Sequence, residues 1–89
     1  AVDIKKDAIR ALGEIRSSEA IAPLTRILAR RTLFNRALND ELRVASAMAL
    51  GEIGDESARA ELENATRDRS STVARAAVQA LMQMEKDNP

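Results

Sequence analysis

The 89-residue sequence has no cysteine and no histidine, and one phenylalanine is its only aromatic residue. Without cysteine there is no disulfide framework and no thiolate chemistry, so we expect a reducing compartment, with the cytoplasm as the default. Without cysteine and histidine a zinc site lacks its usual ligands, and we predict no metal and no other cofactor. Without aromatic anchors, burial must come from many thin contacts, which favours closely packed helices.

The sequence also has no excess of positive or negative charge, because 14 Lys and Arg balance 14 Asp and Glu. No net field attracts the chain to a nucleic acid or to an anionic membrane, so neither is an expected partner. No apolar run approaches the roughly 18 residues that span a bilayer. Nucleophilic catalysis by Ser or Thr needs a neighbouring base, and no motif supplies one without histidine. The sequence therefore predicts that the protein is not an enzyme.

What the sequence does contain is a repeated pentapeptide, Ala-Leu-Gly-Glu-Ile. It stands at residues 11–15 and again at 49–53, and a diverged copy, Ala-Leu-Met-Gln-Met, stands at 80–84. The copies begin 38 and then 31 residues apart, as expected for a two-helix repeat with one insertion. We predict a single domain with repeat 1 at about 3–30, an insertion at about 31–39, repeat 2 at about 40–68 and half of a third repeat at about 69–85.

A stack of repeats needs polar caps at both ends, and half a repeat is an unusual place for a stack to stop. We therefore expect the chain to be a fragment of a longer protein. We also expect its exposed ends to cause weak self-association, either as continued stacks or as a dimer.

Apolar residues recur with helical spacing around each pentapeptide and predict one buried face for the first helix of each repeat. These faces comprise Ile4, Ala8, Ala11, Leu12 and Ile15; Leu42, Ser46, Ala49, Leu50 and Ile53; and Val73, Ala77, Ala80, Leu81 and Met84. The second helices of repeats 1 and 2 are indicated by Ala20, Ile21, Leu24, Ile27 and Leu28 and by Ala58, Leu62 and Ala65. The pattern predicts an all-α chain of five helices.

Residues with turn and capping chemistry separate the predicted helices. Gly54 can take the left-handed conformation that ends a helix, and Asp55 can cap the next one. Asp40 and Ser71 stand at matching positions ahead of the first helices of repeats 2 and 3, where N-caps are expected. Pro23 lacks a backbone N–H and fits the first turn of its helix, so that helix should begin shortly before it.

The second repeat has an apolar flank that the other repeats lack. Val44 and Met48 stand where the other copies have charged or polar residues. The preceding insertion contains the apolar residues Leu33, Phe34 and Leu38. We predict that one of these three side chains covers Val44 and Met48.

The stretch from Leu42 to Ala58, which contains the intact pentapeptide followed by Gly-Asp-Glu-Ser-Ala, resembles the HEAT repeat in the short form named after phycobiliprotein (bilin) lyases. The resemblance covers nearly the whole chain. The sequence departs from the family pattern at the insertion and at Met82, which replaces the glycine of the pentapeptide. It implies a right-handed α–α superhelix, an armadillo-like solenoid of about two and a half repeats, in which the second helices line a concave wall that binds proteins.

From the resemblance we expect a protein-interaction or scaffolding module whose partner is another protein, although fold alone does not decide function. An accessory domain of a bilin lyase and a nucleic-acid-binding HEAT module are the alternatives. A single phenylalanine is a poor platform for a planar tetrapyrrole, and there is no aromatic pair to stack on bases.

Four polar residues form the candidate partner-binding site: Arg26, Arg30, Asn64 and Arg67. Arg26 and Arg30 lie one turn apart on the polar side of the predicted second helix of repeat 1. If the second helices line one wall, the 38-residue offset places Asn64 and Asp68 beside them and brings Arg67 to the same wall. A solvated charged face with i,i+4 ion pairs is the simpler interpretation of these residues.

Two carboxylates also occupy equivalent positions in successive repeats. Glu14 and Glu52 would lie roughly 10 Å apart, one helix spacing. That separation is within the range of paired acid and base carboxylates. Nothing in the sequence places them in a pocket, so we interpret both as solvent-exposed.

Overall fold

The computed structural model describes residues 2–30 and 35–87, and these residues form five α-helices. The helices are α1 (Val2–Glu14), α2 (Ile21–Ala29), α3 (Arg36–Ile53), α4 (Arg59–Ala65) and α5 (Ser71–Asp87), with the 3₁₀ turns η1 (Ser18–Ala20) and η2 (Glu56–Ala58) ahead of α2 and α4. The predicted all-α chain of five helices is confirmed. Within the described residues, no helix combines the length and the apolar character needed to cross a bilayer.

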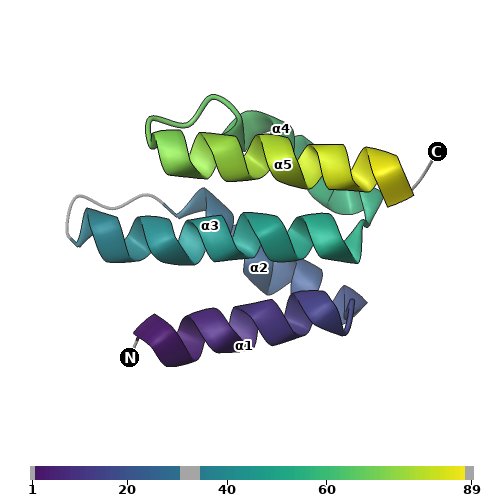
Figure 1. The fold of residues 1–89 in the computed structure, drawn as a ribbon, viewed down its shortest axis with the longest axis horizontal. Helices are drawn as coiled ribbons and strands as arrows, with labels where there is room; N and C mark the ends of the chain where they lie inside the picture. The colour runs from purple at the N-terminus through teal and green to yellow at the C-terminus, as the bar shows by residue number, and fades with distance from the viewer. Residues whose placement is uncertain (1, 31–34, 88–89) are drawn as a thin grey trace.

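The helices form two layers (Figure 1). The first helices of the repeats, α1, α3 and α5, lie side by side and run in the same direction, and α2 and α4 lie behind them. Helix α3 is central, because it packs against α1, α2 and α5. This stack of helix pairs is the predicted α-solenoid.

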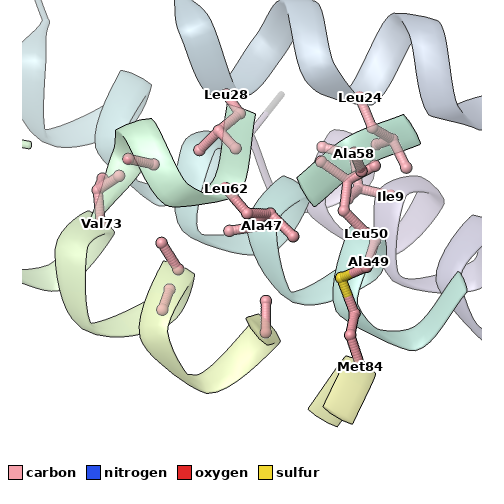
Figure 2. Close-up of a cluster of buried hydrophobic side chains, with 14 of the residues drawn as sticks. Ile9, Leu24, Leu28, Ala47, Ala49, Leu50, Ala58, Leu62, Val73 and Met84 are labelled. Carbon is pink, nitrogen blue, oxygen red and sulfur yellow. The ribbon is translucent and has the colours of Figure 1, made fainter. Parts of the chain in front are cut away.

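The core lies between the two layers (Figure 2). Leu24 and Leu28 of α2, Leu50 of α3 and Leu62 of α4 are completely or almost completely buried there. Buried alanines fill the places where two helices approach closely: Ala47, Ala49, Ala58, Ala65, Ala76, Ala77 and Ala80. The thin contacts expected from a sequence with one aromatic residue therefore make up a large part of the core.

The repeated pentapeptide sets the spacing of the first helices. A Cβ added at Gly13 would lie 2.9 Å from the Cα of Ala49, and a Cβ added at Gly51 would lie 2.7 Å from the Cα of Ala80. A side chain at either glycine would therefore meet the backbone of the next first helix, and interiors packed this closely have no room to absorb it. The glycine of each intact copy is a packing residue for the alanine of the following copy.

The predicted end of α3 is confirmed and its predicted start is wrong. Gly54 ends α3 in the left-handed conformation, with φ 72°, and Asp55 accepts a hydrogen bond from the Ser57 N–H at 2.8 Å. Asp40 does not cap α3, because the helix begins four residues earlier, at Arg36. Part of the expected insertion is therefore an extension of α3, and residues 31–34 lie outside the described residues.

The other boundaries are close to their predicted places. Pro23 is the third residue of α2, as its missing N–H requires. The N-cap predicted at Ser71 is one residue too late. Ser70 stands ahead of α5, and its Oγ accepts a hydrogen bond from the Val73 N–H at 3.4 Å.

The predicted buried face is right for α3 and α5 and only partly right for α1, where Leu12 is half-buried against the core. All five predicted residues of α3 and all five of α5 are buried or half-buried. In repeat 1, Ala8, Ala11 and Ile15 are exposed, Ile15 by 69%, whereas Ile9 and Gly13 are buried. In α3 and α5, this apolar face includes the alanine that packs on the first helix of the preceding repeat. No described helix lies on the corresponding face of α1.

One buried polar contact joins the repeats. The Arg43 side chain on α3 is only 4% exposed, and its Nε donates to the carbonyl of Leu28, at the end of α2, at 2.8 Å. Its two terminal nitrogens hold the carboxylate of Asp68, with Nη1 at 3.2 Å from Oδ1. Asp68 also accepts from the Ser70 N–H at 2.9 Å. Arg43 therefore fastens α2 and the α4–α5 connection to α3.

Candidate functional site

A groove of about 700 Å³ runs between α1 and α3. Its lining residues all come from the first helices: Lys6, Arg10 and Glu14 of α1; Ala37, Asp40, Glu41, Val44, Ala45, Met48, Ala49 and Glu52 of α3; and Thr72 of α5. The groove therefore lies on the layer of first helices and not on the second-helix wall that the resemblance implied.

The floor of the groove contains the apolar flank noted in the sequence. Val44 is half-buried and Met48 is 47% exposed. Of the three side chains predicted to cover them, Leu38 is itself 45% exposed and does not line the groove. The other two, Leu33 and Phe34, lie outside the described residues, so a cover from either of them stays a prediction.

Charges of both signs border this apolar floor. The α1 side carries Lys6 and Arg10, which stand one helical turn apart. The α3 side carries Asp40 and Glu41 in one turn and Glu52 near the end of the helix. A hollow with an apolar floor and charged borders of both signs has the general make-up of a protein-binding surface.

The two carboxylates singled out in the sequence meet in this same groove. Glu14, which is exposed, and Glu52, which is half-buried, both line it. The sequence alone placed them in no pocket, so this shared location is new. No group of three or more side chains suited to metal binding occurs in the part of the chain that the structure describes.

The residues predicted to bind a partner lie in the last turns of the second helices or just beyond them. Arg26, Arg30, Asn64 and Arg67 are all exposed. Arg26 lies in the last turn of α2, but Arg30 follows the helix with an extended backbone, φ −72° and ψ 119°. Arg30 is therefore the C-cap of α2, one position beyond the last helical residue. Arg67 likewise lies beyond the end of α4.

A second, smaller hollow of about 310 Å³ lies between α2 and α4. Asn64 is the one predicted binding residue that lines it, together with Ala29, Arg43, Glu61, Ala65 and Asp68. Asp68, which was predicted to stand on the wall beside Arg30, has a side chain only 3% exposed and is held by Arg43. Its carboxylate therefore fastens the repeats together and is not offered to a partner.

Comparison with known families decides the identity of the fold. The family model described as HEAT repeats matches residues 31–89. The chain belongs to the HEAT repeat family. A second model, the PBS lyase HEAT-like repeat, matches residues 4–30 of this HEAT repeat protein. No curated protein matches it.

The groove was the feature that sequence reasoning missed in this HEAT repeat protein. The signal was present, because Val44 and Met48 are apolar where the equivalent residues of repeat 1 are Lys6 and Arg10. The apolar flank predicts a surface that is covered from within the chain. Among the described residues, α1 lies beside this flank, and residues of α1 and α3 line the hollow between the two helices.

Proposed function

We propose that this HEAT repeat protein is a protein-interaction module, with no catalytic activity of its own, and that it holds a segment of a partner protein in the groove between α1 and α3. The observation that carries the proposal is Met48, 47% exposed on the floor of a groove of about 700 Å³. Large apolar side chains that stay exposed within a bordered hollow are typical of binding sites. Methionine also adapts its shape to different partner side chains.

The borders of the groove specify the chemistry of the partner. An aliphatic side chain fits the floor formed by Val44 and Met48. Acidic partner residues complement Lys6 and Arg10, and a basic partner residue complements the carboxylates of α3. The equal numbers of acidic and basic residues in the chain support a protein partner of mixed charge over a polyanion.

Neither alternative from the resemblance gains support from the described residues. Phe34 is the only aromatic residue of the sequence, so the chain offers at most one ring to a tetrapyrrole or to a base. Arg26 of α2 and Arg30 at its C-cap are two positive charges in a chain whose acidic and basic residues balance, so they do not make a strongly basic surface. Bilin binding and nucleic-acid binding stay predictions of the family resemblance.

A selection of random peptides displayed on phage, with the whole chain as bait, tests the proposal. The enriched peptides should share an aliphatic residue with acidic and basic neighbours. Met48→Glu places a charge on the floor and should weaken their binding at least tenfold, about 1.4 kcal/mol. Met82→Glu is the matched control, because Met82 is 63% exposed on α5 and does not line the groove.

Fluorescence anisotropy of labelled peptides gives the affinities, and circular dichroism checks that each variant keeps its helical content. Equal affinity for the parent and for Met48→Glu would show that the groove is not the binding site. Failure to enrich any peptide on the folded chain would overturn the proposed function itself.

A further inference from the structure

The groove between α1 and α3 gathers negative charge, although the chain as a whole is neutral. More acidic than basic side chains line it: Glu14, Asp40, Glu41 and Glu52 against Lys6 and Arg10. Four carboxylates against two cations leave an excess of two negative charges on its walls. An occupant with more basic than acidic residues therefore complements the groove best.

The carboxylates of the groove are not neutralised by cations of the chain itself. Asp40 lies 3.5 Å from Arg43, but the guanidinium of Arg43 is already held by the buried carboxylate of Asp68. The other three make no ion pair within residues 2–30 and 35–87: Glu14, Glu41 and Glu52. Their negative charges can therefore attract basic side chains of an occupant.

The acidic and apolar side chains of the groove follow a fixed order along α3. Helical spacing places four of them in one row: Glu41, Val44, Met48 and Glu52. The two apolar residues stand one turn apart in the middle, with a carboxylate at each end. Glu14 is the equivalent of Glu52 in repeat 1, so it adds a second carboxylate at that end. From residue 41 to residue 52 the row is about 16 Å long, or three turns of a helix.

The middle of the groove offers almost nothing to which an extended backbone could hydrogen-bond. Its apolar lining contains no donor, and the sulfur of Met48 is only a weak acceptor: Ala37, Val44, Ala45, Met48 and Ala49. The backbone groups of α1 and α3 are used within those helices. An extended segment would leave its own N–H and C=O groups without partners against this lining, which is costly. A helix satisfies these groups internally, so the groove favours a helical occupant.

We propose, on the basis of the proposed function, that the groove binds a net-basic amphipathic helix of a partner protein, about three turns long and antiparallel to α1 and α3. Two aliphatic residues one turn apart pack on Val44 and Met48. Basic residues on either side of them reach Glu41 at one end and Glu52 at the other.

The direction of the bound helix follows from helix dipoles. Helices α1 and α3 run in the same direction (Figure 1). An antiparallel helix opposes both dipoles and brings its positive N-terminus to the end that carries Glu14 and Glu52. Since the row of α3 is then met in reverse, the bound segment has the order basic-x-x-x-aliphatic-x-x-x-aliphatic-x-x-basic.

Three alanine-based peptides of about 18 residues, long enough to form a helix in water, test the proposal on the whole chain by fluorescence anisotropy. The first carries arginine and leucine in this order, the second has glutamate in place of both arginines, and the third has a proline between the two leucines. The second should bind roughly tenfold more weakly than the first, because its charges meet carboxylates. The third should bind at least as weakly, because proline breaks the helix.

Peptides with a single arginine test the direction of the bound helix. Glu52→Gln should weaken the peptide with arginine at its N-terminal end roughly threefold, as expected for a partly exposed ion pair, and leave the peptide with arginine at its C-terminal end unchanged. Glu41→Gln should have the reverse effect. Glu63→Gln is the matched control, because Glu63 is exposed on α4 and does not line the groove. Circular dichroism checks that each variant keeps its helical content.

Equal affinities of the arginine and glutamate peptides, or full binding of the proline peptide, would overturn the basic helix as the occupant. The proposed function would still stand if peptides selected on phage lost affinity in Met48→Glu. Binding of the arginine peptide to Phe34→Ala but not to the parent would show that the insertion of this chain is the occupant, and would also overturn the proposal.

A second copy of the chain is the remaining alternative occupant. Exposed positions of α5 carry basic and apolar residues in a related order: Arg75, Val78, Met82 and Lys86. Sedimentation of the parent chain decides this point. A dimer that becomes monomeric both in Met48→Glu and in Met82→Glu would show that α5 of a second copy occupies the groove, and would overturn a separate partner helix. A monomeric parent that binds the arginine peptide supports the proposal.

Discussion

Replacing Asp68 by alanine should destabilise the protein more than its position in a connection between helices suggests. The Asp68 side chain is 3% exposed and that of Arg43 is 4% exposed. Removing one partner of a buried ion pair leaves the other charge uncompensated, which costs roughly 3–5 kcal/mol. In Asp68→Ala, the Arg43 side chain keeps its hydrogen bond to the Leu28 carbonyl. It also keeps a weaker ion pair with Asp40, in which Nη1 lies 3.5 Å from Oδ1. We therefore expect the low end of that range, about 3 kcal/mol.

A loss of this size is a large share of the free energy of unfolding of a small domain. A domain of 89 residues has a stability of roughly 4–13 kcal/mol, at about 0.05–0.15 kcal/mol per residue. Urea unfolding followed by circular dichroism suits a chain without tryptophan or tyrosine. At roughly 1–2 kcal/mol per M, the unfolding midpoint should fall by about 2 M. Asp7→Ala, at an exposed position of α1, is the matched control and should move the midpoint little.

The pair can be separated from its two members by a double-mutant cycle. Arg43→Met removes the other charge, and the variant with both substitutions has no buried charge left uncompensated at this contact. The loss of unfolding free energy in the double variant should be about 2 kcal/mol smaller than the sum of the losses in the single variants, since the effects of substitutions at contacting residues are not additive. Additive effects, or an Asp68→Ala midpoint equal to that of Asp7→Ala, would refute the argument that this contact joins the repeats.

Three further substitutions have expected outcomes. Gly51→Ala should destabilise by roughly 1–3 kcal/mol in urea unfolding despite the better helix propensity of alanine, because its Cβ would lie 2.7 Å from the Cα of Ala80; a stabilised variant would contradict the close approach. Ser46→Ala should stabilise by about 1 kcal/mol, because the buried Oγ has no hydrogen-bond partner within the described structure and both other repeats have alanine there; unchanged or reduced stability would count against this. The hydrogen bond from the Ser57 N–H lowers the pKa of Asp55 below its ordinary value, so its ionised form stabilises the fold above about pH 4 and that contribution is lost as the pH falls through the lowered pKa. The stability difference between the parent and Asp55→Ala should therefore shrink on acidification, and a difference that stays constant between neutral pH and pH 3 would contradict the cap.

The helices and their order follow from the sequence alone because the signals that specify them are local. Apolar residues at helical spacing predict a helix wherever they occur, and the repeated pentapeptide indicates which helices are equivalent. Gly54 and Asp55 act within one turn of their own positions, so their roles were predictable without knowledge of any neighbour. The start of α3 was missed because the insertion contains no apolar periodicity that distinguishes a helical extension from a loop.

Only the tertiary structure decided which faces are covered. The same periodic pattern stands in α1, α3 and α5, yet Ala11 is exposed while Ala49 and Ala80 are buried. Periodicity specifies that a helix has an apolar face, but the burial of that face depends on whether another helix lies on it.

The candidate sites were decided in the same way. Arg43 and Asp68 stand 25 residues apart and carry no motif, so their buried contact could not be predicted from spacing. The groove beside Met48 exists because α1 packs on Ala49 at the distance that Gly13 allows and leaves the neighbouring turn of α3 open. The sequence determined the helices and their repeat, whereas the approach of one helix to the next determined the surfaces available for binding, because a hollow is a property of two packed helices and not of either one.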